Sequence, residues 1–387
     1  MKKVLIFTCI GGGGHISASN ALEAYLKNDY NVEQLDIFAD PIGHIDPLYW
    51  LTLKKYNGEL LYNFFMRHRL FWAINLLFYM GCFFFWLNEK RIIRNLIKTI
   101  QKHKPDIIVS VIPIINHCCV IAADACNVPF ILSPTDFDGT TFVRRMGSIN
   151  TKPFTIALSF DHPLIKKPLD DEKISASHIN TTGFILRPSF FELMDKSVIR
   201  AEFMVPEEIP VITLMMGAIG SKTLVPFVKI LANLAQRAHL IICVGKNEQL
   251  KKQISTLCFS SNITYTVVGF TDKIAPLLKI TDIFITKSGS VSVCEGLYTN
   301  TPMLLDATST VLRWEKLNHE FLESIGGGIS FKSYKQLFAE VSRLLSSADD
   351  LATMRHNLEK LDKKNGAQEI KKLIAHQLLS NKTSSNE

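Results

Sequence analysis

The chain has 387 residues, of which 47% are hydrophobic, and it carries a formal net charge of +7. The length allows two domains, and the apolar content is high enough for full cores, which excludes a disordered protein. The positive charge suits an anionic surface or ligand, but no nucleic-acid-binding module accompanies it. The eight cysteines form no Cys-x-x-Cys pair, so we expect reduced thiols, a cytoplasmic location and no bound metal.

The first element is a mostly apolar strand that ends in a glycine turn. The strand is Val4–Ile10, residues 11–14 are four consecutive glycines, and His15 precedes a predicted helix over Ser17–Lys27. Glycines let the chain turn tightly and let a ligand reach the backbone, and the N-terminus of a helix favours anions. The pattern predicts a phosphate or nucleotide-sugar site at this turn, with the titratable side chain of His15 beside it.

Strands and helices alternate along the chain, which predicts an α/β architecture with parallel sheets. A polar helix over Ser189–Met204 separates two series of strands, so we expect two Rossmann-like domains, 1–190 and 191–375, followed by a disordered tail, 376–387. The expected strands are Val4–Ile10, Asn31–Ile37, Asp106–Ile112, Phe130–Ser133 and Phe154–Leu158, then Val211–Met216, Leu240–Val244, Thr264–Val268, Ile283–Thr286 and Met303–Leu305.

One segment interrupts the alternation. Residues 70–87 are uncharged and rich in Phe, Trp and Leu, and their length just reaches that of a membrane span. Both flanks are basic, so the charge asymmetry usual for a span is missing. The alternatives are a span, a helix buried in the core, and a helix or helical hairpin in a membrane interface, for which aromatic apolar faces with basic flanks are typical. We expect peripheral contact with an anionic membrane through residues 60–95.

Several short motifs occur in the order found in one enzyme family. Residues 11–19, Gly-Gly-Gly-Gly-His-Ile-Ser-Ala-Ser, resemble the monogalactosyldiacylglycerol synthases and bacterial processive diacylglycerol glucosyltransferases, and more distantly the GlcNAc transferase of peptidoglycan lipid-intermediate synthesis. The resemblance implies a GT-B fold, in which two Rossmann-like domains face each other across a cleft, and an inverting glycosyltransferase that uses a UDP-sugar without a metal or other cofactor. The other matching segments are Pro134–Phe137, Thr182–Phe190, Val268–Thr271, Thr286–Ser290, Glu295–Leu297 and Arg313–Asn318.

An inverting transfer needs a base that takes the proton of the acceptor hydroxyl, and a histidine can do this at neutral pH. His15 is the first candidate because it lies beside the glycine turn. Asp136, in the Pro-Thr-Asp segment, is the second, either as the base or as a partner of His15. The structural alternatives are a histidine that caps the helix and an ordinary turn aspartate.

The donor site is expected mainly in the second half. Glu295 can accept both ribose hydroxyls, and Ser290 can meet phosphate at a helix start. Glu315 and Asn318 lie three apart on a helical turn and can bind sugar hydroxyls, while Arg187 can neutralise the diphosphate. The structural alternatives are a solvated helix glutamate for Glu295, two surface residues of a helix start for Glu315 and Asn318, and a hinge salt bridge for Arg187. The full set of expected donor-binding residues is Gly13, Gly14, Arg187, Gly217, Gly220, Ser221, Phe270, Lys287, Gly289, Ser290, Glu295, Glu315 and Asn318.

The sequence does not fit a P-loop protein, and it departs from the family pattern at several positions. The spacing from Gly217 to Lys222 is one residue too short for a P-loop. Trp314 stands where the family has Gln, and the family's His and Trp are absent after Phe137.

We expect a hexosyltransferase acting on a membrane lipid such as diacylglycerol, at the inner face of the membrane. The alternatives are a polyprenyl-linked or other glycan acceptor, or a GT-B protein that binds a sugar nucleotide or a membrane without transferring a sugar.

Overall fold

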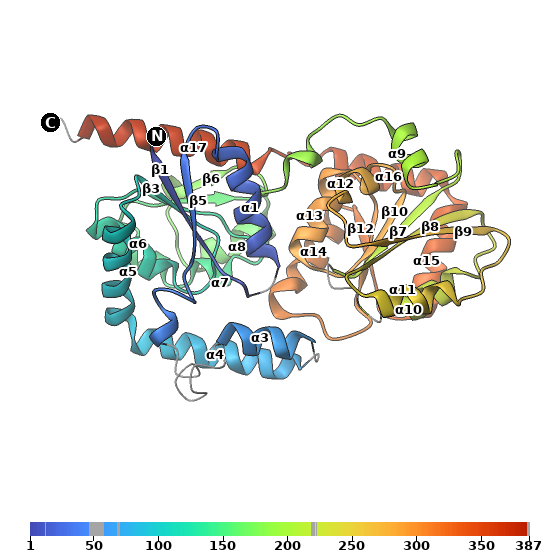
Figure 1. Ribbon diagram of the computed structural model, residues 1–387, viewed down its shortest axis with the longest axis horizontal. Helices are drawn as coiled ribbons and strands as arrows, with labels where there is room; N and C mark the ends of the chain where they lie inside the picture. The colour runs from blue at the N-terminus through green and yellow to red at the C-terminus, as the bar shows by residue number, and fades with distance from the viewer. Residues whose placement is uncertain (12, 46–57, 68–69, 218–220, 222, 385–387) are drawn as a thin grey trace. The chain divides into compact units, whose positions relative to one another are not determined.

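The computed structural model describes residues 1–384 apart from 12, 46–57, 68–69, 218–220 and 222. The chain divides into two compact units, unit 1 with residues 1–188 and 363–387 and unit 2 with residues 189–362. Each unit contains a six-stranded parallel sheet with helices packed around it (Figure 1). The predicted α/β fold with two Rossmann-like domains is therefore confirmed.

The sheet of unit 1 has the order β2-β1-β3-β4-β5-β6. Because β2 lies on one side of β1 and β3 on the other, the strand order reverses between β1 and β3. In parallel α/β sheets, ligands bind beyond the carboxyl ends of the strands at such a reversal. The strands are β1 (Lys3–Thr8), β2 (Asn31–Asp36), β3 (Ile107–Ser110), β4 (Phe130–Leu132), β5 (Thr155–Leu158) and β6 (Ile179–Thr181).

The sheet of unit 2 repeats this plan, with the order β12-β11-β10-β7-β8-β9 and a reversal between β7 and β10. Its four central strands, β7, β8, β10 and β11, are buried along almost their whole length and are mainly apolar, as expected for strands covered on both faces of a sheet, whereas the edge strands β9 and β12 are partly exposed. The strands of this sheet are β7 (Val211–Met215), β8 (Ala238–Gly245), β9 (Ile263–Gly269), β10 (Ile283–Thr286), β11 (Met303–Asp306) and β12 (Gly328–Phe331).

The helices of unit 1 include the end of the chain. One face of the sheet is covered by α1 (Gly14–Leu26) and α17 (Gly366–Ser384), whose buried residues Leu22 and Ile370 join one core with Ile6 of β1. The other α-helices of unit 1 include α3 (Gly58–Arg67), α4 (Phe71–Leu87), α5 (Glu89–His103), α6 (Asn116–Ala125), α7 (Thr140–Val143) and α8 (Pro163–Asp171).

The last helix corrects the expected domain boundary. Residues 363–375 were expected in the second domain and 376–387 in a disordered tail, but α17 continues to Ser384 and belongs to unit 1. Its apolar residues Ala367, Ile370 and Ile374 are fully buried, which gives the helix a fixed place against α1. Residues 385–387 lie outside the described part of the chain.

The expected long helix over Ser189–Met204 is also wrong. The α-helix found there, α9 (Lys196–Glu202), is shorter: it begins after Asp195, whose side chain accepts a hydrogen bond from the backbone of Ser197, and Pro188–Phe190 form a separate 3₁₀ turn. The remaining helices of unit 2 are α10 (Leu224–Leu231), α11 (Glu248–Ser255), α12 (Ile274–Lys279), α13 (Ser290–Tyr298), α14 (Lys316–Ser324), α15 (Tyr334–Ser346) and α16 (Ala348–Glu359).

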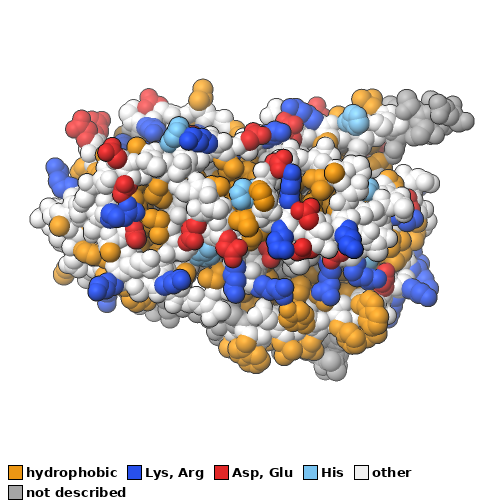
Figure 2. Space-filling model, turned by 180° about the vertical axis from the view of Figure 1, so that it is seen from behind, with side chains coloured by type: hydrophobic (Ala, Val, Ile, Leu, Met, Phe, Trp, Pro, Cys, Tyr) orange, Lys and Arg blue, Asp and Glu red, His pale blue; other side chains and the backbone are white. Residues whose placement is uncertain are grey.

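The uncharged segment forms α4, which lies beside α3 (Figure 1). One side of α4 is in the core, where Ile74 is 1% exposed, whereas Trp72 is 70% exposed and Phe83 is 60% exposed. The alternative of a helix that is buried in the core on all sides is therefore wrong. Within the described residues, we find no helix with the length and apolarity needed to span a membrane. Figure 2 shows hydrophobic side chains gathered along the lower edge of the view, with Lys and Arg side chains above them.

Candidate active site

His15 lies at the point where the strand order of unit 1 reverses. It belongs to the first turn of α1, after β1, and its Nδ1 is 2.8 Å from the carbonyl oxygen of Val111, directly after β3. The same nitrogen is 2.9 Å from the hydroxyl of Thr135, which follows β4. The loops after three neighbouring strands thus meet at one imidazole, at the edge of the sheet where α/β proteins bind ligands.

The Val111 contact fixes the tautomer of His15. A carbonyl oxygen can only accept a hydrogen bond, so Nδ1 must carry the proton, and in a neutral ring Nε2 then has a free lone pair. Burial lowers the pKa of His15 to about 4, although the bond to Val111 opposes this effect. At neutral pH the ring is therefore uncharged, and Nε2 is in the state that a general base requires.

Asp136 is close to His15 in the chain fold but does not hydrogen-bond its ring. Among the described residues, the partners of the imidazole are Val111 and Thr135, and Asp136 is the half-buried residue that follows Thr135. The predicted role of Asp136 as a partner of His15 thus passes to Thr135 in this structure. The Pro-Thr-Asp segment contained the signal, but the sequence did not show which of its two polar residues faces the histidine.

The glycine turn keeps space open in front of α1. Gly13 is the residue before α1 and Gly14 is its first residue, and a Cβ added to Gly13 would meet no atom within 4 Å. Ile10 and Ile16, on the two sides of the turn, are 41% and 37% exposed. A ligand can therefore approach the backbone at Gly13.

Unit 2 places a lysine at its own reversal point. Lys287 follows β10, and Gly217 follows β7 with a φ of 89°, a conformation that favours glycine. A Cβ at Gly217 or at Gly289 would come within 3.4 Å of Cε of Lys287. Two glycines thus form a cradle for the lysine side chain, which makes no ion pair with any described residue. Its ammonium group is placed at the carboxyl edge of the sheet, where it can meet an anion.

Asn318 supports the turn that follows Lys287. Its side chain is fully buried, and its amide nitrogen donates to the carbonyl of Ser288 at 2.6 Å and to the hydroxyl of Ser290 at 3.0 Å. The predicted donation to a sugar hydroxyl conflicts with this geometry, because both contacts use the same amide inside unit 2. Glu315 lies at the same turn and accepts a hydrogen bond from the hydroxyl of Ser288 at 3.3 Å.

The other predicted donor-binding residues are distributed around the carboxyl edge of the second sheet. Glu295 is 6% exposed on α13. The pKa of the nearby thiol of Cys243 is raised by burial and, to a lesser extent, by the charge of Glu295. Phe270 follows β9 with its ring 61% exposed, and Nζ of Lys246 lies 4.5 Å from the ring centroid. Ser221 accepts a hydrogen bond from the Thr223 hydroxyl.

Two further residues were predicted to bind the donor, Gly220 and Arg187. Gly220 lies outside the described residues. Arg187 is half-buried near the end of the first segment of unit 1, after β6. The contacts of all these residues with a ligand stay predictions.

One group of potential metal ligands was not foreseen from spacing. Glu89, His117 and Cys118 present one ligand atom each within 4.8 Å of one another. The guanidinium of Arg145 already bonds Glu89 at 2.8 Å and Nε2 of His117 at 3.0 Å. Burial raises the pKa of Cys118 to about 12, so the thiol stays protonated. The arginine takes the place that a cation would need, and we assign no metal to this group.

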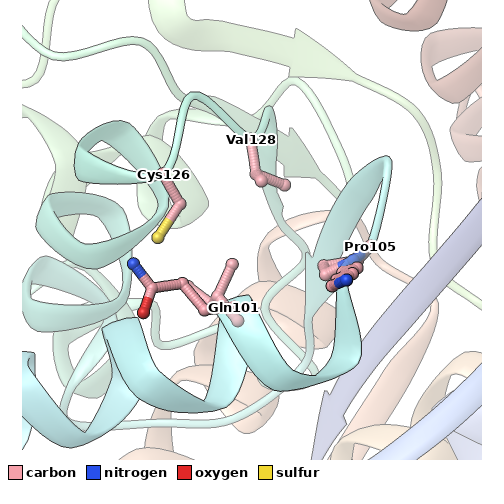
Figure 3. A pocket seen from close by; sticks show the side chains of 6 residues that line it. Gln101, Pro105, Cys126 and Val128 are labelled. Carbon is pink, nitrogen blue, oxygen red and sulfur yellow. The ribbon is translucent and has the colours of Figure 1, made fainter.

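A surface pocket of about 450 Å³ lies at the opposite end of the first sheet's strands from His15 (Figure 3). Pro105 and Val128, which line it, come shortly before β3 and β4, so the pocket is at the amino ends of these strands. Burial raises the pKa of its cysteine, Cys126. Since His15 is beyond the carboxyl ends, this pocket is not part of the candidate active site.

Comparisons with known proteins agree with this arrangement. Residues 15–176 match the monogalactosyldiacylglycerol (MGDG) synthase family, and residues 211–377 match the glycosyltransferase family 28 C-terminal domain. A processive diacylglycerol beta-glucosyltransferase of Bacillus pumilus (strain SAFR-032) is 25% identical over 99% of this chain and 97% of its own length. A protein of the same name from Bacillus subtilis (strain 168) is 25% identical over 95% of this chain and 94% of its own.

The fold has counterparts among solved structures. MurG of Acinetobacter baumannii has a TM-score of 0.63 and 13% sequence identity, with 97% of this chain and all of the MurG chain covered. This likeness concerns the fold alone. The resemblance seen in the motifs is confirmed: along nearly its whole length the chain is similar to processive diacylglycerol beta-glucosyltransferases, and its fold is the GT-B fold of proteins such as MurG.

Proposed function

We propose that this protein is an inverting glycosyltransferase that moves a hexose from a UDP-sugar to a membrane lipid such as diacylglycerol. The observation that carries the proposal is the neutral, tautomerically fixed His15 at the strand reversal of unit 1, in a chain that resembles diacylglycerol glucosyltransferases from end to end. No cofactor takes part in the proposed reaction, and the UDP-sugar is a substrate.

The proposed chemistry is a single displacement. Nε2 of His15 takes the proton of the acceptor hydroxyl while that oxygen forms a bond to the anomeric carbon. The bond from the anomeric carbon to the β-phosphate oxygen breaks, and its electron pair leaves with UDP. Positive charge near the diphosphate stabilises this departure, and the Lys287 ammonium in its glycine cradle supplies it.

In the proposed complex, the uridine and ribose lie along the carboxyl ends of the strands of the second sheet. Glu295 binds the ribose hydroxyls, Phe270 offers an exposed ring to the base, and the start of α13 at Ser290 receives phosphate. Glu315, beside the same turn, binds a sugar hydroxyl. Arg187 adds charge for the diphosphate, and Asp136 lies near the acceptor.

The exposed side of α4 has the features of a membrane-binding surface, which supports a lipid as the acceptor. Trp72, Leu76, Phe83 and Leu87 are between 52% and 70% exposed and follow a helical period, so they form one apolar stripe. On the adjoining α5, an exposed row of cations follows: Arg91, Arg94, Lys98 and Lys102, none of which makes an ion pair with a described residue. Apolar side chains that enter the interface and cations that meet anionic headgroups are the two parts of peripheral membrane binding. We place the protein at the inner face of the membrane.

The test is release of UDP by purified protein mixed with liposomes. UDP-glucose, UDP-galactose and UDP-GlcNAc are each offered with anionic liposomes that contain or lack diacylglycerol, and the lipid product is identified by mass spectrometry. We expect UDP release that depends on diacylglycerol and a glycosylated lipid from at least one donor. UDP binding without release in every mixture, including one with a polyprenyl-phosphate-linked acceptor, would instead identify a binding protein that transfers nothing.

A further inference from the structure

The ring of His15 has two acceptors on one nitrogen and a free lone pair on the other. The Val111 carbonyl and the Thr135 hydroxyl both lie within 2.9 Å of Nδ1. Thr135 is 3% exposed, so water cannot take over its contact easily. No carboxylate among the described residues hydrogen-bonds this imidazole, although a base that becomes positively charged usually needs an orienting partner.

We infer that Thr135 is a positioning residue for His15: together with the Val111 carbonyl, it holds the Nδ1–H tautomer and aims Nε2 at the acceptor hydroxyl. This inference rests on the proposed function for the identity of the reaction, whereas the tautomer follows from the geometry alone. During transfer, the acceptor proton moves to Nε2, the ring becomes an imidazolium, and its Nδ1–H stays bonded to both oxygens, the Val111 carbonyl and the Thr135 hydroxyl.

Local packing supports this role for the threonine. Thr135 lies three residues beyond β4 in the buried segment Ser133–Thr135, and the first residue of this segment still bonds to the neighbouring strand, from the Ser133 amide to the Ser110 carbonyl. The ring of Phe142 lies 6.1 Å from the imidazole ring, centroid to centroid. The ring is therefore set from the Nδ1 side by hydrogen bonds, while the wall beside it is apolar and cannot compete for its proton.

Removal of the Thr135 hydroxyl is the direct test. In Thr135→Val the shape is kept and one acceptor is lost, so we expect kcat to fall about 10- to 100-fold, as for a hydrogen bond to a charged group, with little change in KM for the UDP-sugar. Thr135→Ser keeps the hydroxyl and should restore most of kcat. The matched control is Thr281→Val, which removes a buried hydroxyl of unit 2 bonded to Thr213 and to the Leu277 carbonyl; its kcat should equal that of the wild type.

Nitrogen NMR of the imidazole gives a readout that does not depend on activity. In ¹⁵N-histidine-labelled full-length protein, with the His15 signals assigned by their loss in His15→Ala, Nδ1 should be the protonated nitrogen and Nε2 the unprotonated one at pH 7. A protonated Nε2, or a folded Thr135→Val with kcat within twofold of the wild type, would overturn the inference. If Thr135→Val does not fold, Thr135→Ala takes its place in the kinetic comparison.

The two proposals fail in different ways. A wild-type protein that transfers no sugar contradicts the proposed function, yet the NMR measurement still decides whether Nδ1 carries the proton. An active wild type with an unaffected Thr135→Val contradicts only the positioning role.

Discussion

At the scale of single residues, His15 and Lys287 each lie at the reversal of strand order in the sheet of their own unit. Each follows a strand at the reversal of strand order, His15 after β1 and Lys287 after β10. Burial keeps the His15 imidazole neutral, so the ring can take up a proton. Gly217 and Gly289 leave room for the side chain of Lys287, whose ammonium group can bind an anion. The fold thus offers a base in one unit and a positive charge in the other.

The charge of Lys287 can be removed without loss of its length. We expect Lys287→Met to weaken UDP binding about 10- to 100-fold, because a hydrogen bond to a charged group is lost. Calorimetric titration of the variant with UDP measures this, and Lys251→Met, on the exposed side of α11, is the matched control. Unchanged UDP affinity in Lys287→Met would remove this lysine from the donor site.

The sequence alone identified most candidate residues of the site, but it did not show which side chains lie next to them in the fold. The glycine turn and His15 are contiguous, and the helix start near them is a local signal. Thr135 is 120 positions away, and only the parallel pairing of β1, β3 and β4 brings it to the ring. For Asn318, helical spacing indicated a pair with Glu315 that binds sugar hydroxyls, but the Asn318 side chain is buried and its amide bonds to Ser288 and Ser290.

At the scale of elements, the long apolar strands were predicted well and the short polar ones were missed. β6 is Ile-Asn-Thr and β12 is Gly-Ile-Ser-Phe, and neither has the apolar run that marks a buried strand. The helix α17 shows a further limit of local signals. Its apolar face predicts that it packs against something, but the pattern does not say that the partner is α1 in unit 1.

The exposed stripe of α4 gives a prediction for one element. Trp72, Phe83 and Leu87 are each at least 60% exposed, so their replacement by Ser should leave the fold intact. We expect the triple variant to remain in the supernatant when it is centrifuged with anionic vesicles that sediment the wild type, with UDP affinity unchanged.

Ile74→Ser is the contrasting variant for this helix, because Ile74 is 1% exposed and its replacement should destabilise the protein. If the triple variant unfolds as Ile74→Ser does, the stripe belongs to the core. If the folded triple variant still sediments with vesicles, the membrane contact lies elsewhere.

At the scale of the whole molecule, buried histidines connect stability to pH. Burial lowers the pKa values of His15, His117 and His239 to about 4, whereas in the unfolded chain they are near 6.5. The unfolded state therefore binds more protons as the pH falls from about 6.5 to 4, and the free energy of unfolding decreases over this window. For His15 alone the decrease is about 3 kcal/mol.

Urea denaturation between pH 7 and pH 4 tests this linkage. The midpoint should fall with pH in the wild type, and the fall should be shallower in His15→Gln, which lacks one titrating group. An equal pH dependence in the two proteins would mean that His15 is not buried as a neutral ring.

The central claim is that a base in unit 1 drives sugar transfer, and turnover of His15→Ala tests it most directly. A positioned base contributes roughly 100- to 10,000-fold to the rate. With UDP-hexose and diacylglycerol liposomes, we therefore expect kcat of the folded variant to fall at least about 100-fold, while UDP affinity by calorimetry stays that of the wild type. A folded His15→Ala enzyme with nearly full turnover would contradict the account and move the role of base to Asp136.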